Sequence, residues 1–296
     1  MTVARELARA AQRLGAAGVE SPRTDAELLA AHVLGVDRAR LVLAAGFDAG
    51  QAARFEELVT ARARRIPVQH LLGRAAFRHL DLAVGPGVFV PRPETELLAG
   101  WGIEVAKAFT QPVVVDLCSG SGAIALAVAQ ELPHARVYAV ERDPEALAWL
   151  RRNAAERAEA GDRPIEVAAA DVTELGAARA FGGAMGGALA ALTGRVDVVL
   201  CNPPYVPDGA AVPPEVADHD PAAAVFGGPD GLAVIRPVVA LAAILLRPGG
   251  AVGIEHDDSH TAAVVALLRN AFTGIETHLD LAGRPRFATA WQTDTS

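Results

Sequence analysis

Four consecutive residues, Asn202, Pro203, Pro204 and Tyr205, combine groups that could hold an amino group. They follow an apolar run at 198–200, which predicts a buried parallel strand because no polar residue alternates within it. The two prolines exclude helix and ladder pairing, so a stiff turn places the Asn202 side-chain oxygen beside the Pro203 carbonyl. Two fixed acceptors suit a planar NH2 group, and Tyr205 adds a flat face. Taken alone, Asn-Pro-Pro is also an ordinary turn sequence.

A glycine-rich loop lies earlier in the chain, between a predicted strand at 113–117 and an apolar helix. Gly120 and Gly122 allow the backbone to approach a ligand closely, and the helix N-terminus favours a carboxylate or phosphate. This pattern alone fits both a dinucleotide and S-adenosylmethionine.

Acidic residues near the ends of three successive strands distinguish these two ligands. Asp116 precedes the glycines, where it would attract an ammonium and a sulfonium and repel a pyrophosphate. Glu141 follows strand 136–140 and can accept from both ribose hydroxyls, and Asp171 follows strand 165–169 and can accept from an adenine amine. Each acid alone could cap a helix, but three in succession favour S-adenosylmethionine over NAD.

The elements that must position these residues alternate between strand and helix. We predict strands at 113–117, 136–140, 165–169, 196–200, 251–255, 274–279 and 285–292, with helices between most of them. This order predicts a doubly wound, mostly parallel sheet. The Gly/Ala-rich stretch at 176–194 is interpreted as an insertion, and 206–231 as a long loop.

The first part of the chain has helical spacing, and 77–90 changes to period two around a Gly-Pro-Gly turn at 85–87, which predicts a β-hairpin. We expect a helical domain at 1–75, a hairpin linker at 76–92 and a ligand-binding α/β domain at 93–296. Arg62, Arg64 and Arg65 form a compact basic cluster. It could be a solvated helix face or a contact for an acidic or RNA-bearing partner.

Composition restricts the class of protein. The 296 residues are 51% hydrophobic, which allows a sizeable core, and the net charge of −8 argues against bulk electrostatic binding of nucleic acid. The longest apolar run, 237–246, is too short to span a bilayer, and we expect a cytoplasmic protein. The only two cysteines, Cys118 and Cys201, imply no disulfide framework. They are interpreted as small buried fillers, with a redox sensor as the alternative.

The chain resembles the glutamine methyltransferases that modify peptide chain release factors. The resemblance is carried by Ser-Pro-Arg-Thr-Asp-Ala-Glu-Leu-Leu at 21–29, Val-Phe-Val-Pro-Arg-Pro-Glu-Thr-Glu at 88–96, and the motifs at 67–73, 116–123, 202–205 and 220–232. Asn-Pro-Pro-Tyr alone marks many amino-group methyltransferases, but the stretch at 88–96 narrows the match. Departures from the family are Cys118 for a glycine, Ser119 and Ser121 for threonines, His70 for a tyrosine, and Val172 at a tryptophan-like position.

The resemblance implies a Rossmann-like class I methyltransferase with a seven-stranded mixed sheet and a small N-terminal helical domain for substrate recognition. It implies methyl transfer from S-adenosyl-L-methionine, leaving S-adenosyl-L-homocysteine, to the glutamine of the Gly-Gly-Gln loop of class I release factors. The cofactor-binding residues would be Asp116, Cys118, Ser119, Gly120, Ser121, Gly122, Glu141, Asp171, Val172, Asn202, Phe89, Pro91, Arg92, Glu94 and Thr95. The catalytic residues would be Asn202, Pro203, Pro204 and Tyr205, and Phe89 would join Asn202, Pro203 and Tyr205 in binding substrate.

An amide nitrogen is a poor nucleophile, so two acceptors that orient it and stabilise its growing positive charge supply the required help. No metal or dedicated base is implied. Three alternatives remain open: a glutamine of a ribosomal protein, an amino group of a nucleic-acid base, and a non-catalytic adaptor for translation. We expect a monomer with no direct nucleic-acid binding, and the acidic net charge counts against the base.

Overall fold

A computed structural model describes residues 2–177 and 189–293. The chain divides into two compact units. The first comprises Met1–Ala75, Val84–Pro86 and Val212–His219, and the second comprises Ala76–Ala83, Gly87–Ala211 and Asp220–Ser296. The domain boundaries expected from the sequence stay a prediction.

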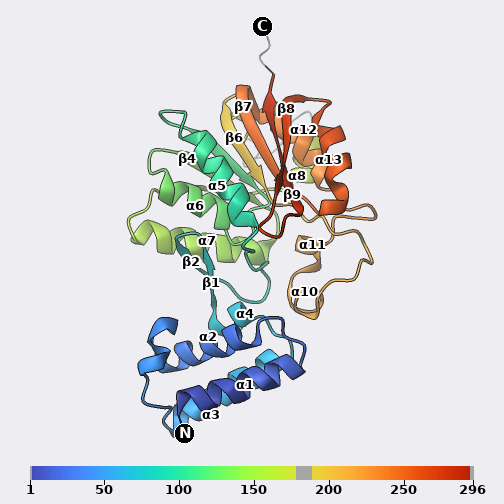
Figure 1. The fold of residues 1–296 in the computed structure, drawn as a ribbon. Helices are drawn as coiled ribbons and strands as arrows, with labels where there is room; N and C mark the ends of the chain where they lie inside the picture. Colours follow the sequence, from blue (N-terminus) through green and yellow to red (C-terminus); the bar gives the residue numbers. More distant parts are fainter. Residues whose placement is uncertain (1, 178–188, 294–296) are drawn as a thin grey trace. The chain divides into compact units, whose positions relative to one another are not determined.

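The first unit is helical (Figure 1). Its elements are α1 (Val3–Ala16), α2 (Pro22–Leu34), η1 (Arg38–Leu43), α3 (Ala49–Ala63), α4 (Val68–Leu72) and α10 (Pro214–His219). Proline at the first position starts α2, and Gly35 ends it at φ +63°. A capping box between Asp48 and Gln51 starts α3. The helices enclose one apolar core that includes Leu14, Leu29 and Phe55.

The basic cluster of the first unit is paired within the unit. Arg62 is only 6% exposed, and its guanidinium donates to Asp25 at 2.6 Å and to Glu215 at 2.8 Å. Arg65 also pairs with Glu215. Burial opposes ionisation of Glu215, but the hydrogen bonds from Arg65 and Arg62 lower its pKa to about 2. The interpretation of Arg62 and Arg65 as a free solvated face was therefore wrong, because their acidic partners lie in the same unit.

The second unit contains a seven-stranded sheet (Figure 1). In spatial order its strands are β5 (Glu166–Ala169), β4 (Arg136–Glu141), β3 (Val113–Leu117), β6 (Val196–Cys201), β7 (Leu246–Glu255), β9 (Pro285–Gln292) and β8 (Phe272–Leu279). The strands from β5 to β7 are parallel, and β9 pairs antiparallel to both β7 and β8. The expected Rossmann-like mixed sheet is confirmed. Strand order reverses between β3 and β6, which is where such sheets bind ligands.

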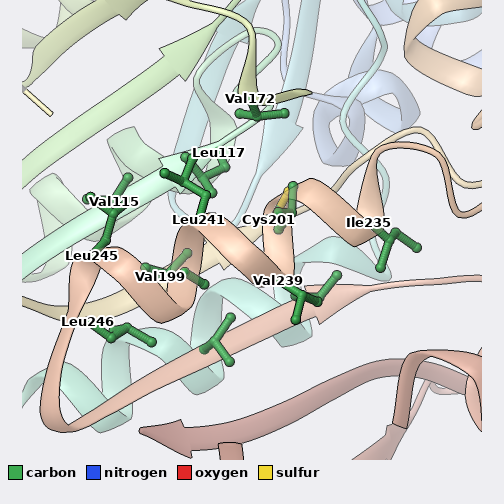
Figure 2. Close-up of a cluster of buried hydrophobic side chains, with 14 of the residues drawn as sticks. Val115, Leu117, Val172, Val199, Cys201, Ile235, Val239, Leu241, Leu245 and Leu246 are labelled. Carbon is green, nitrogen blue, oxygen red and sulfur yellow. The ribbon is translucent and has the colours of Figure 1, made fainter. Parts of the chain in front are cut away.

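The helices of this unit are α5 (Thr95–Ala106), α6 (Ala123–Glu131), α7 (Pro144–Glu159), α8 (Val172–Ala177), α11 (Ala222–Val225), α12 (Ile235–Leu245) and α13 (Thr261–Leu268), with the 3-10 helix η2 at Asp258–His260. All six residues of β6 are buried, because successive side chains enter opposite cores. Val199 packs with α12 in one apolar cluster (Figure 2), whereas Val198 and Leu200 pack in another cluster with residues of α5 and α6.

Some local predictions differ from the structure. The hairpin strands are β1 (Arg74–Phe77) and β2 (Leu80–Ala83), so the turn lies at 78–79 rather than at 85–87. The loop at 206–231 contains the short helices α10 and α11, and most of the expected insertion at 176–194 lies outside the described residues. Within residues 2–177 and 189–293, no helix is both long and apolar enough to cross a membrane.

Candidate active site

Five neighbouring strands bring polar residues to one edge of the sheet. Asp116 is the penultimate residue of β3, Glu141 ends β4, and Asp171 follows β5 by two residues. Asn202 directly follows β6, and Glu255 ends the adjacent β7. Because these strands are parallel, their carboxyl ends meet at a common edge. The topology thus places four sequence-predicted residues together and adds Glu255, which was not predicted.

The Asn-Pro-Pro-Tyr turn is held closely by the loop that follows it. Pro203 and Pro204 are buried, while Asn202 and Tyr205 are partly buried. A Cβ on Gly227 would lie 2.5 Å from the Pro204 carbonyl oxygen, and a Cβ on Gly231 would lie 2.3 Å from that of Tyr205. Only glycine allows such an approach of two backbones, so these glycines fix the turn's position.

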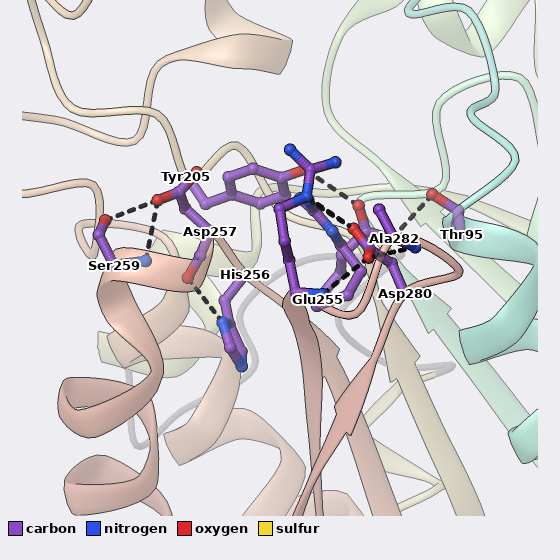
Figure 3. A network of polar contacts seen from close by, with 10 residues as sticks. Thr95, Tyr205, Glu255, His256, Asp257, Ser259, Asp280 and Ala282 are labelled. Carbon is purple, nitrogen blue, oxygen red and sulfur yellow. Dashed lines mark hydrogen bonds and ion pairs between the residues drawn. The ribbon is translucent and has the colours of Figure 1, made fainter.

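A chain of hydrogen bonds fixes the side chains at this turn. The Asn202 Nδ2 donates to Thr95 Oγ1 at 3.1 Å, and Thr95 Oγ1 donates to Glu255 Oε2 at 2.7 Å. The Tyr205 hydroxyl donates to Glu255 Oε1 at 3.0 Å. Figure 3 shows these contacts of Glu255 with Thr95 and Tyr205. The two ends of the turn are therefore joined through one carboxylate.

Burial sets the acid–base properties of these groups. Glu255 is 1% exposed, and burial raises its pKa to about 7, against the hydrogen bonds from Thr95 and Tyr205. Burial, with the charge of Glu255, raises the pKa of Tyr205, so the phenol stays protonated and remains a donor. Sequence reasoning missed Glu255, although it lies at a strand end like the acids that were predicted.

Asp116 is buried, and only one of its two carboxylate oxygens accepts a hydrogen bond from the described residues. Its Oδ2 accepts from the Ala125 amide at 3.2 Å, whereas its Oδ1 has no hydrogen-bond partner among the described residues. Burial raises its pKa to about 7. An unpaired buried carboxylate oxygen is costly, and a cationic ligand group would satisfy it. The site therefore fits the ammonium of the cofactor predicted from the sequence.

The glycine-rich loop has the backbone expected of a ligand cradle. Gly120 and Gly122 have φ of +55° and +86°, and a Cβ on Gly122 would lie 2.4 Å from a Leu150 methyl group. Cys118 also has a positive φ, +59°, which explains why a glycine is usual there in the resembled family. Ser119 and Ser121 are buried in the same loop.

Glu141 and Asp171 are at the predicted strand ends and already hold backbone groups. Glu141 Oε2 accepts from the Gly120 amide at 2.9 Å, and its Oε1 accepts from the Arg142 and Asp143 amides. Asp171 accepts from Thr173 and pairs with Arg142 at 3.0 Å. Burial opposes ionisation of Asp171, but these contacts lower its pKa. Sequence reasoning missed Arg142, whose partner is distant in sequence.

The stretch at 88–96 is tied to the other motif segments. Arg92 pairs with the buried Asp220 at 2.5 Å, and its guanidinium lies 4.8 Å from the centroid of the Phe89 ring. This ion pair explains the arginine between two prolines. Pro91 and Glu94 lie in the same stretch before α5, and Thr95 is the first residue of that helix. Val172 is the buried first residue of α8.

The two cysteines lie beside this edge. Cys201 is fully buried at the end of β6, and burial together with the neighbouring Cys118 raises its pKa well above the ordinary value. The Cys201 thiol therefore stays protonated, which agrees with its interpretation as a small apolar filler.

Comparisons with known proteins agree with the motifs. Residues 7–73 match the model of the PrmC N-terminal domain, and residues 103–219 match that of the methyltransferase small domain. The chain is 54% identical to the release factor glutamine methyltransferase of Mycolicibacterium smegmatis, over 94% of this chain and 93% of the relative. It is 48% identical to the protein of the same name from Streptomyces coelicolor, over 96% of each.

Solved structures show the same fold. The Thermus thermophilus 16S rRNA N2 G1207 methyltransferase, in complex with AdoMet and guanosine, is 21% identical, with a TM-score of 0.50 over 74% of this chain and 49% of that one. The hMettl16 catalytic domain is 15% identical, with a TM-score of 0.51 over 71% of this chain and 75% of that one. The fold is thus that of methyltransferases. The relatives that match over more than 90% of both chains identify the family within this fold. The chain belongs to the family of release factor glutamine methyltransferases.

Proposed function

We propose that this protein transfers a methyl group from S-adenosyl-L-methionine to the side-chain amide nitrogen of the glutamine in the Gly-Gly-Gln loop of class I release factors. The observation that carries the proposal is the orientation of Asn202. Its Nδ2 is engaged by Thr95, so its Oδ1 remains as an acceptor. An acceptor beside the Pro203 carbonyl suits an amide NH2, and the family supports a glutamine as its source.

Bound S-adenosylmethionine supplies an electrophilic methyl group and leaves as S-adenosylhomocysteine. The free Oδ1 of Asp116 would pair with the cofactor's ammonium, and the backbone at Gly120 and Gly122 would lie against it. Glu141 would accept from the ribose, and Asp171 from the adenine amine. Further contacts are proposed for Phe89, Pro91, Arg92, Glu94, Thr95, Cys118, Ser119, Ser121, Val172 and Asn202.

Asn202 and Pro203 would act on the substrate nitrogen. Their two oxygens accept both amide protons, which holds the nitrogen in place and stabilises the positive charge that develops on it. Such hydrogen bonds strengthen in the transition state, so they lower the barrier rather than only improving binding. The aromatic rings of Tyr205 and Phe89 would line the site and face the sulfonium of the cofactor. The proton can leave after methyl transfer, so no dedicated base is required.

The test uses purified protein, radiolabelled S-adenosylmethionine and a recombinant class I release factor. We expect label on a single glutamine, and none when that glutamine is replaced by alanine. Label that survives the replacement would contradict the substrate assignment. Label found instead on a ribosomal protein or on nucleic acid would favour those alternatives, whereas no transfer to any of these would favour an adaptor.

A further inference from the structure

The carboxylate of Glu255 contacts both ends of the Asn-Pro-Pro-Tyr turn, directly or through one residue. We propose that Glu255 is a positioning residue that sets which way the Asn202 side-chain amide faces, acting through the hydroxyl of Thr95. This inference rests on the proposed function, because it concerns how Asn202 meets the substrate amide. It assigns a role to Glu255 and to Thr95 that differs from a direct contact with substrate.

The direction of the hydrogen bonds follows from the number of protons available. A threonine hydroxyl has one proton, and above pH 7, where Glu255 is ionised, its carboxylate can only accept. The 2.7 Å contact between Thr95 Oγ1 and Glu255 Oε2 therefore uses the Thr95 proton. In the 3.1 Å contact with Asn202, Thr95 must then be the acceptor. The group of Asn202 that faces Thr95 is accordingly its NH2, and Oδ1 faces the other way.

This direction decides what the site can bind. The oxygen and NH2 of an asparagine side chain have nearly the same shape, so sterics alone do not choose between the two orientations. A reversed Asn202 would present a donor to the donor NH2 of the substrate. Glu255, through Thr95, thus makes the site select a group that donates protons. A carboxylate in place of the substrate amide would meet two acceptors and be repelled.

The surroundings of Glu255 bear on its charge. Its second oxygen accepts from Tyr205 at 3.0 Å. Arg286, which pairs with Asp280 at 3.2 Å, also interacts electrostatically with Glu255 and Tyr205. Burial raises the pKa of Glu255 and the charge of Glu94 adds to this, whereas the guanidinium of Arg286 favours the ionised form. One oxygen of this buried carboxylate accepts from Tyr205 of the turn, and the other reaches Asn202 through Thr95. Burying the charge of Glu255 costs free energy, and these hydrogen bonds offset part of that cost.

Replacing Glu255 by glutamine tests the proposal with almost no change in shape. The NH2 of the new side chain can donate to Thr95, whose proton is then free for Asn202 Oδ1, so the chain of hydrogen bonds can reverse. We expect E255Q to lower kcat for release factor methylation by about 10- to 100-fold, less than the roughly 100- to 1,000-fold loss of a direct transition-state hydrogen bond. The value of kcat/KM for release factor should fall at least as far as kcat, because a reversed Asn202 faces the substrate NH2 donor to donor both in the bound complex and in the transition state. The affinity for S-adenosylhomocysteine should change by less than about 3-fold.

A pair of Thr95 variants separates positioning from folding. Thr95→Ser keeps the hydroxyl and should have a higher kcat than Thr95→Val, which removes it and should match E255Q. The affinity for S-adenosylhomocysteine is measured for both variants, because a loss of kcat through a cofactor contact of Thr95 would lower that affinity as well. In the double variant T95V/E255Q, kcat should fall no further than in T95V, because both changes break the same series of hydrogen bonds from Glu255 through Thr95 to Asn202. Asp197→Asn is the matched control. Asp197 is a buried acid near the other end of β6, bonded to the Val113 amide and Arg247, and its replacement should leave kcat unchanged.

The outcomes separate this inference from the proposed function. No transfer to release factor by the wild type would overturn the proposed function. An active wild type with E255Q of equal kcat would overturn the positioning role alone. If E255Q fails to fold by circular dichroism, the Thr95 variants decide. A lower kcat in T95V than in T95S at equal affinity for S-adenosylhomocysteine supports the proposal, whereas equal kcat values, or a loss of kcat matched by a loss of that affinity, overturn it.

Discussion

One acid of the helical unit and two acids at the edge of the sheet have opposite electrostatic surroundings. In the helical unit, Glu215 lies against Arg62 and Arg65, and these contacts lower its pKa to about 2. At the edge of the sheet, Asp116 and Glu255 are buried and form no ion pair with an arginine of the described residues, and burial raises the pKa of each to about 7. The ion pairs of Glu215 connect elements of the helical unit. A buried acid without an ion pair can instead bind a cationic ligand or direct neighbouring hydrogen bonds.

The largest effect on activity should come from replacing Asn202. Replacing Asn202 by alanine removes one acceptor from the substrate nitrogen and should lower kcat by about 100- to 1,000-fold. Isothermal titration should show a much smaller loss of S-adenosylhomocysteine affinity, because the contact proposed between Asp116 and the ammonium remains when the further contact of Asn202 is lost. Full activity in this variant would contradict the role of the turn.

Asp116→Asn should weaken cofactor binding without damaging the fold. Losing a charge-assisted contact with the cofactor's ammonium costs about 1.5–3 kcal/mol, or roughly 10- to 150-fold in affinity. The melting temperature of the free protein should not fall at pH 8, because the variant relieves a buried charge. A large loss of stability with unchanged affinity would place Asp116 among the structural acids instead.

Cofactor affinity should also depend on pH. A cation binds the ionised form of Asp116, and burial raises the pKa of this group in the free protein to about 7. Affinity should therefore be full above pH 7 and fall by about tenfold per pH unit below it, as protonation competes with binding. Titration of S-adenosylhomocysteine between pH 5.5 and 8.5 checks this, and the dependence should flatten in Asp116→Asn. The same slope in both proteins would show that another group is responsible.

The smallest effect on activity should come from the helical unit. Glu215→Gln weakens the pairs with Arg62 and Arg65 and should destabilise the fold by about 1–3 kcal/mol, while cofactor affinity stays unchanged. Because the folded-state pKa of Glu215 is depressed, its stabilisation is present above the unfolded value of about 4.5 and is lost as pH falls toward 2. Denaturant unfolding at pH 7 and pH 2.5 checks this. If the free energies of unfolding of variant and wild type differ by the same amount at pH 7 and pH 2.5, the stabilising role of the ionised Glu215 is contradicted.

The sheet could be predicted because its signals are local. Apolar strands with an acid or asparagine near their ends identified the core strands and four residues of the site: Asp116, Glu141, Asp171 and Asn202. Glu255 meets the same criterion at the end of β7, so the sequence did contain its signal. What the sequence could not show was that Glu255, Thr95 and Asn202 meet, because their separations along the chain reach 160 positions.

The features that were predicted wrongly depend on long-range pairing or on weak local patterns. Arg62 looked like part of a free basic cluster because its partner Glu215 lies 153 positions away. The hairpin was misplaced because its strands are only four residues long, and the apolar residues at 88–90 imitate a strand without belonging to one. Period-two spacing over so few residues does not fix where a turn falls.

The central claim is that a glutamine of a release factor receives the methyl group through this site. Its most direct test is the mass of the Gly-Gly-Gln peptide of class I release factors, isolated from cells that lack this protein and carry either the wild-type chain or Asn202→Ala. We expect the peptide to gain one methyl group with the wild type and to stay unmodified with the variant. A methylated peptide in cells without the protein, or equal methylation by both chains, would contradict it.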